Sequence, residues 1–234
     1  MDGAQLSFYD HRCRTGRGGP RPGAGRPRKR QSNRRPSHAA RPRHSRYVPV
    51  HATLRVGRGL PSLRRKRYLA ELRRSLRALQ SRAGFRVCHY SVQRDHLHLI
   101  VEADDGAALA SGMKALGARV ARAANRAFGR IGTVLAERCH LRALRTPAEV
   151  RAALAYVLLN ARKHAWQHIR CAPRAALDIA SSGLFFDGWS RPPEAFDDES
   201  GRRPKDVSRA ESWLLRIGWR IHHSLIDPDE VPGR

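Results

Sequence analysis

Two histidines, His96 and His98, lie one residue apart in the stretch RDHLHLIVEA. The apolar residues around them alternate as in a β-strand, where successive side chains point to opposite faces of the sheet. Both histidines would then point the same way, with backbones about 6.5–7 Å apart, so that both imidazoles could reach one metal ion. Two half-exposed histidines on an open sheet face are the alternative. Glu102 shares this face, either as a solvated carboxylate at the strand end or as a group that tunes the site.

A phenol and an amide stand in an otherwise apolar helical stretch, ALAYVLLNA. Tyr156 and Asn160 are four residues apart, which places them on one helical face, one turn from each other. The small side chains of Ala152 and Ala153 would leave room beside them for a substrate strand. Read alone, Tyr156 is an amphipathic core residue and Asn160 a polar neighbour whose buried amide needs a partner. A metal ion or a phosphate would serve as that partner.

The elements that must position these residues follow each other as βαββαβα. Alternating β-branched stretches and leucines at helical spacing predict these elements, with strands near 49–56, 85–93, 96–103 and within 133–146, and helices over 63–83, 106–129 and 147–169. Ser62 is the expected N-cap of the first helix. Thr146, Pro147 and Glu149 form a capping box at the start of the last one. The order predicts an α+β fold, a ferredoxin-like antiparallel sheet (βαββαβ) with helices on one face and an additional C-terminal helix.

The net charge of +26 predicts a polyanionic partner, most simply nucleic acid. Residues 1–46 carry 13 Lys and Arg against 2 Asp and Glu, residues 47–170 carry 24 against 7, and residues 171–234 carry 9 against 11. We interpret the first segment as a disordered basic arm, the second as the domain that carries both histidines and Tyr156, and the third as an extension of unknown role. In the arm, Arg26 and Arg28 belong to an AT-hook-like GRPRKR segment, which would enter a DNA minor groove or act as a nonspecific basic arm.

A stripe of arginines at intervals of three or four residues follows the second predicted helix, and its members are Arg119, Arg122, Arg126 and Arg130. The stripe is either a solvated helix face or a set of DNA phosphate contacts. In the extension, Trp213, Leu214, Ile217 and Trp219 are the expected anchors of a short amphipathic helix, and residues 193–206 are an expected flexible linker.

The location of the protein is predicted from what the sequence lacks. The four cysteines form no CxxC pair, which argues against a structural zinc site and a disulfide framework. No apolar run reaches the roughly 18–20 residues of a membrane span, and the amino terminus has no apolar signal core. A cytoplasmic, nucleoid-associated protein without membrane contact is therefore expected.

HLHLIVE followed by LAYVLLNARKHA resembles the HUH single-tyrosine transposases of the REP-associated, insertion-sequence-like group. The resemblance covers about residues 47–170 and includes Asn125 and the stretch GRIGTVLAER. The last helix departs from the better-known members, which have Asn-Pro where this chain reads LNARKHA. The resemblance implies that His96 and His98 bind a divalent metal, Mg²⁺ or Mn²⁺, with Asn160 as a third ligand. It also implies that Tyr156 on the last helix is the nucleophile.

The activity implied by the resemblance is cleavage and rejoining of single-stranded or hairpin DNA through a 5′-phosphotyrosine. The phosphodiester energy is then kept in the covalent bond, so no ATP site is needed, and the sequence contains no GxxxxGK[ST] motif. Whether Tyr156 acts in its own subunit or in that of a homodimer stays open at this point. The alternative function is that of a non-catalytic, domesticated nucleic-acid-binding protein.

Overall fold

The computed structural model of the chain describes residues 44–169, 177–193 and 203–233. Arg26 and Arg28 of the predicted AT-hook-like arm therefore lie outside the described residues, as does most of the predicted linker 193–206. None of the helices in the described ranges is both long and apolar enough to cross a membrane.

The centre of the fold is a four-stranded sheet with the strand order β2-β3-β1-β4, in which every neighbouring pair is antiparallel. The strands are β1 (Val50–Arg55), β2 (Phe85–Val92), β3 (His96–Ala103) and β4 (His140–Ala143). The prediction of an α+β fold with an antiparallel sheet is confirmed. Strand β3 begins and ends at the predicted residues because its alternating pattern is bounded by the short link from β2 and by Asp104 and Asp105.

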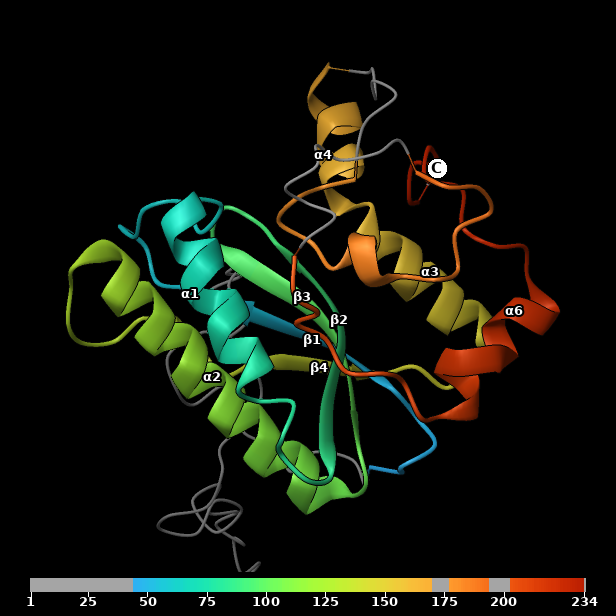
Figure 1. Cartoon of the computed structure of the whole chain (residues 1–234), viewed down its shortest axis with the longest axis horizontal. Coiled ribbons are helices and arrows are strands. Elements are labelled where there is room, and N and C mark those ends of the chain that lie inside the picture. Colours follow the sequence, from blue (N-terminus) through green and yellow to red (C-terminus); the bar gives the residue numbers. More distant parts are fainter. Residues whose placement is uncertain (1–43, 170–176, 194–202, 234) are drawn as a thin grey trace, which may run out of the picture. The chain divides into compact units, whose positions relative to one another are not determined.

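Helices α1 (Lys66–Arg77) and α2 (Gly106–Phe128) cover one face of the sheet (Figure 1). Strand β3 turns its leucines and Val101 towards them, as the alternation predicts. The expected Ser62 cap of the first helix is wrong, because α1 begins at Lys66 and its N-cap makes no side-chain hydrogen bond. Leu63 is instead fully buried and donates its N–H to the carbonyl of Arg94 at 2.9 Å. The residues before α1 therefore pack against the β2–β3 link.

Helix α3 (Pro147–Leu158) lies on the opposite face of the sheet and begins at the predicted capping box of Thr146 and Glu149. The predicted helix does not run unbroken to Ile169, because Leu159 leaves helical geometry (φ −109°, ψ 19°) and α4 (Asn160–Ile169) begins after it. Leu158, Leu159 and Asn160 are all buried. Successive residues of a regular helix point about 100° apart, so the break accommodates consecutive buried side chains that one straight helix facing the sheet would not.

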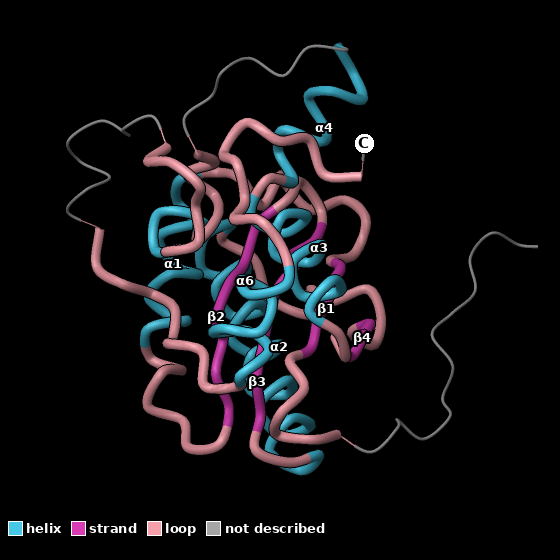
Figure 2. The backbone as a smooth tube through the Cα atoms, turned by 90° about the vertical axis from the view of Figure 1, so that its right-hand side faces the viewer, coloured by secondary structure: helices cyan, strands magenta, loops and turns pink. Residues whose placement is uncertain are grey.

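The C-terminal extension packs on the same side as α3 through η2 (Gly183–Phe185), the π-helical turn η3 (Leu214–Gly218) and α6 (Trp219–His222). Figure 2 looks onto this side of the sheet. Trp219 is fully buried in a cluster with Leu215 and with Ile100 of β3. The expected anchors Trp213 and Ile217 are wrong, since they are 50% and 43% exposed. A π-helical turn changes the spacing of buried positions from that of a regular helix.

Candidate active site

His96 and His98 meet on the face of β3 that points away from α1 and α2. Their Nε2 atoms lie 3.0 Å apart and their rings stand nearly perpendicular. The Nδ1 atom of His96 is 2.7 Å from a carboxylate oxygen of Asp95, which precedes it in the β2–β3 link. Burial would raise the pKa of Asp95, but hydrogen bonding to His96 and the charges of His96 and Arg55 outweigh it and hold this pKa below its usual range. The carboxylate thus orients the imidazole of His96.

Two residues of the neighbouring strand β1 hold the other nitrogen of His98. The Nδ1 atom of His98 is 3.2 Å from Nε2 of His51 and 3.2 Å from Oγ1 of Thr53, its direct partner in the ladder. Burial and neighbouring positive groups lower the pKa of His98 to about 3 and that of His51 to about 4. Both rings are therefore neutral near pH 7. If Nδ1 of His98 carries the proton, its Nε2 offers a lone pair towards the site.

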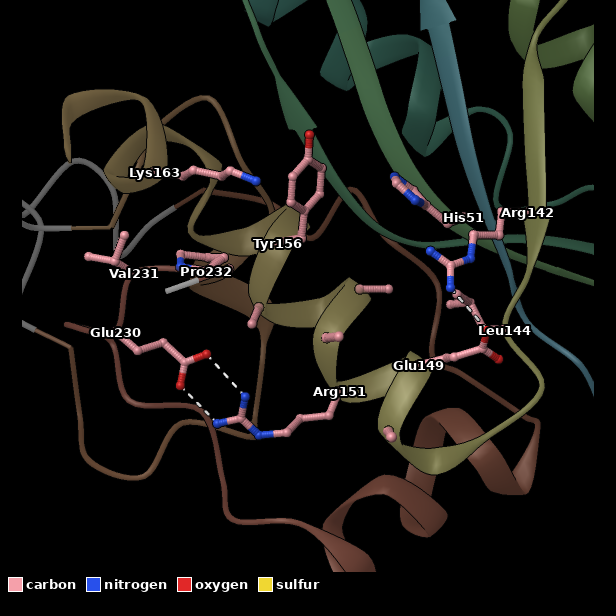
Figure 3. A pocket seen from close by; sticks show the side chains of 15 residues that line it. His51, Arg142, Leu144, Glu149, Arg151, Tyr156, Lys163, Glu230, Val231 and Pro232 are labelled. Carbon is pink, nitrogen blue, oxygen red and sulfur yellow. Dashed lines mark hydrogen bonds and ion pairs between the residues drawn. The ribbon is translucent and has the colours of Figure 1, made fainter. Parts of the chain in front are cut away.

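Tyr156 reaches the same place from α3. Its hydroxyl lies 3.4 Å from Nε2 of His98, and the two ring centroids are 4.9 Å apart in an edge-on contact. The ammonium of Lys163, one turn into α4, lies 4.7 Å from the centroid of the Tyr156 ring. Figure 3 shows Tyr156 between Lys163 and His51. Helix α3 thus brings a phenol over the histidine face of the sheet.

Asn160, the predicted third ligand, is fully buried at the first position of α4. Neither its amide nitrogen nor its amide oxygen has a hydrogen-bond partner among the described residues. The break at Leu159 means that the i, i+4 spacing of an unbroken helix does not relate Asn160 to Tyr156. The structure therefore brings Tyr156 and His96 into contact with His98. Asn160 follows Tyr156 closely in the sequence, and its buried amide has no partner among the described residues.

The donor set suits a divalent ion. Imidazole nitrogens bind transition metals at about 2.0–2.1 Å, and two such atoms 3.0 Å apart can share one ion. An amide oxygen such as that of the buried Asn160 is the kind of hard donor that Mg²⁺ or Mn²⁺ favours. Among the described residues no group of three or more His, Cys, Asp or Glu is placed to hold a metal. A third protein ligand, if there is one, would therefore be of another residue type, such as the asparagine predicted from the sequence.

Two hollows border residues of this site. The larger, of about 780 Å³, runs along α3, and Tyr156, Lys163, His51 and the small residues Ala152 and Ala153 line it (Figure 3). The smaller, of about 390 Å³, opens beside His96. Its other lining residues include two arginines and one histidine, Arg64, Arg94 and His164. A chain-like ligand could cross the site from one hollow to the other.

Comparison with known proteins shows which family part of the chain resembles. Residues 50–140 match the family model described as "Transposase IS200 like". This stretch of the chain is therefore similar to the IS200-like transposases. The match includes β1, β2, β3 and α2 with both histidines, whereas Tyr156 and Asn160 follow it in the sequence. No curated protein matches the chain.

Among solved structures, the chain is similar to one described as "Structure of the REP associates tyrosine transposase bound to a REP hairpin". The two chains are 18% identical, and the TM-score is 0.49. The similarity covers 72% of this chain and 99% of that one.

The predicted arginine stripe lies away from this site. Its members belong to α2 or follow it directly, and α2 covers the other face of the sheet. The Nε atom of Arg126 donates to a carboxylate oxygen of Glu71 in α1 at 2.7 Å, and Arg130 donates to the carbonyl of Thr133. Arg119 is partly buried and Arg122 is exposed. Any DNA contact of these residues would therefore be made on a different surface from the Tyr156 site.

Glu102 is not the solvated carboxylate that its position at the strand end suggests. Its side chain is 1% exposed and accepts the backbone N–H groups of Glu211 at 2.7 Å and Ser212 at 3.1 Å. The Nε atom of Arg86 lies 3.5 Å from the same carboxylate. Glu102 therefore fastens the C-terminal extension to β3. The sequence could not show the contact between Glu102 and Glu211, because the two residues are 109 positions apart.

Proposed function

We propose that this chain is a tyrosine transposase that cleaves and rejoins single-stranded or hairpin DNA. The observation that carries the proposal is the contact between the Tyr156 hydroxyl and Nε2 of His98, at 3.4 Å, beside the 3.0 Å pair with His96. A phenol from one layer of the fold and two imidazoles from another converge on one point. The similarity of residues 50–140 to the transposase family supports the same assignment.

In the proposed reaction, the Tyr156 oxygen attacks a DNA phosphorus atom. The new P–O bond joins the 5′ side of the break to tyrosine, the P–O3′ bond breaks, and the departing 3′-oxygen takes up a proton. The reverse reaction with a 3′-hydroxyl rejoins DNA, so the energy of the phosphodiester is conserved. Lys163, over the Tyr156 ring, is placed to pair with the phosphate that approaches the phenol.

His96 and His98, with Asn160 as the third ligand, would hold the divalent ion in this proposal. Such an ion polarises the phosphate and stabilises charge on the leaving oxygen. The protein's own part is to fix the ligands: Asp95 orients His96, and His51 and Thr53 hold Nδ1 of His98. Partners of this kind set the tautomer and ring orientation of a ligand histidine.

We further propose that Tyr156 acts in its own subunit. The contact with His98 is made within one chain, so a second subunit is not needed to complete the site. The strand would lie in the hollow along α3, where Ala152 and Ala153 leave space, and would continue past His96. With DNA as the substrate, the expected location is the cytoplasm, at the nucleoid.

A labelled hairpin with a single-stranded flank tests the proposal. Incubated with the full-length protein and Mn²⁺, it should yield a labelled band that survives denaturing electrophoresis at the mass of protein plus DNA. Tyr156→Phe should lose the band and keep DNA binding, whereas the control Tyr47→Phe, at an exposed position, should retain it. Chelation by EDTA should stop the reaction. DNA binding without an adduct under every condition would indicate a non-catalytic binding protein instead.

A further inference from the structure

A second concave site lies between β2 and the C-terminal extension. It is a hollow of about 190 Å³, and the residues that line it include His89 of β2, Phe185, Phe186 and Leu215. Four cationic residues of the extension also line it, and they are Lys205, Arg209, Arg216 and Arg220. The reaction proposed for Tyr156 uses none of these residues.

The concentration of charge at this hollow is not expected from composition. Residues 171–234 contain 9 Lys and Arg against 11 Asp and Glu, yet four of those nine cations line one hollow. Its only acidic lining residue, Asp187, has an 83% exposed side chain and pairs with Arg220. Within the described part of the chain, Lys205, Arg209 and Arg216 form no ion pair. Cations that serve only to keep a surface in contact with water are not expected to cluster around one cavity.

His89, one of the residues that line the hollow, has a polar atom without a partner. The Nδ1 atom of His89 is buried and has no hydrogen-bond partner among the described residues, while its ring packs edge-on against Phe186 at 5.3 Å. Burial, together with the charges of Lys205 and Arg220, lowers the pKa of His89 to about 4 against the opposing effect of Asp187. The imidazole is thus neutral, and both nearby cations act on it. An anion in the hollow would offset the mutual repulsion of the four cations that line it.

We propose that this hollow is a second phosphate-binding site, formed by His89 with Lys205, Arg209, Arg216 and Arg220. Clustered arginines bind phosphate through several N–H groups in a fixed geometry, and the hollow has the size for a phosphate rather than for a whole drug-like ligand, which needs roughly 300–1,000 Å³. The site gives the C-terminal extension a function beyond covering the sheet.

The position of the hollow favours DNA as the source of the phosphate, an assignment that rests on the proposed function. His89 pairs with Ile100 in the ladder, two residues along β3 from His98 and on the same face. Strand and sheet spacings place the backbones of His89 and His98 about 8 Å apart. One DNA molecule could therefore contact both sites, one phosphate at Tyr156 and another in the hollow.

The test compares the double variant Arg209→Gln/Arg216→Gln with a control of equal charge change, Arg67→Gln/Lys114→Gln. Arg67 and Lys114 are exposed on α1 and α2, on the other face of the sheet. Two properties are measured on the full-length proteins. The first is the rise in unfolding temperature caused by inorganic phosphate at constant ionic strength. The second is the salt dependence of binding to a single-stranded oligonucleotide in EDTA, where no cleavage occurs.

The wild type and the control should show a saturable rise with phosphate, and Arg209→Gln/Arg216→Gln should lose it. If DNA supplies the phosphate, the slope of log K against log salt should fall by about one in this variant and less in the control. Loss of the phosphate effect with an unchanged slope would assign the site to a free phosphate compound. Equal behaviour of the two double variants would overturn the site, while adduct formation by the wild type would still support the proposed function.

Discussion

Replacement of Asn160 by leucine, which has the same branched arrangement of side-chain atoms but no polar group, tests whether Asn160 is a metal ligand or a structural residue. Asn160 is fully buried, and both polar atoms of its amide are unpartnered among the described residues. A buried polar group without a hydrogen bond costs about 1–3 kcal/mol. If the amide is kept for a metal, Asn160→Leu in EDTA should be more stable than the wild type by about 2 kcal/mol, which for a chain of this size corresponds to roughly 4–8 °C in Tm.

The same variant should respond less to metal. An ion at a hundred times its dissociation constant stabilises a protein by about 2.7 kcal/mol, and the wild type should gain this amount in Mn²⁺. Thermal unfolding in EDTA and in a Mn²⁺ titration measures both effects, with His96→Ala as the control that removes the site. An Asn160→Leu protein that is less stable than the wild type in EDTA, yet keeps the full Mn²⁺ shift, would refute the assignment of Asn160 as a ligand.

Three further changes probe the parts that position the site. In a urea titration, Glu102→Gln should lower the free energy of unfolding by about 3 kcal/mol, which is the usual cost of breaking a buried ionic contact. A decrease below about 0.5 kcal/mol would show that the carboxylate does not hold the extension on the sheet. Gly112→Ala should cost about 1–3 kcal/mol by overpacking, because a Cβ there would come within 2.2 Å of the Phe85 ring; an unchanged Tm would contradict this. As the pH falls from about 6.5 to about 4, the His89→Leu variant should lose less stability than the wild type. The reason is that the unfolded wild type takes up a proton on His89 in this range, whereas the folded protein does not. Parallel curves of unfolding free energy against pH for the two proteins would show that His89 does not cause the loss.

Local patterns in the sequence predicted the elements that carry the site. The alternation of β3 identified its buried leucines and the histidine face, and the capping box marked the start of α3. These features depend on residues close together in the chain. The partners of His98 could not be found in this way, because His51 and Thr53 face it only through the pairing register of β1 with β3. The alternation of HATLR would have placed them on one face had that register been known.

The features that the sequence did not predict depend on packing between residues far apart in the chain. The break at Leu159 has no proline or glycine to mark it, and it follows from the burial of successive residues against the sheet and the extension. The burial of Glu102 likewise depends on Ser212 and its neighbour, far along the chain. The exposure of Trp213 and the burial of Leu215 follow from a π-helical turn, which amphipathic spacing does not predict.

The central claim is that Tyr156 forms the covalent bond to DNA, and mass spectrometry of the adduct tests it most directly. Trypsin cleavage after Arg151 and Arg162 releases the peptide AALAYVLLNAR, in which Tyr156 is the only tyrosine. After reaction with hairpin DNA in Mn²⁺ and nuclease digestion, this peptide should carry the mass of a 5′-linked nucleotide on its tyrosine. A nucleotide found on a different peptide, or none on any peptide while the DNA is cut, would contradict the account.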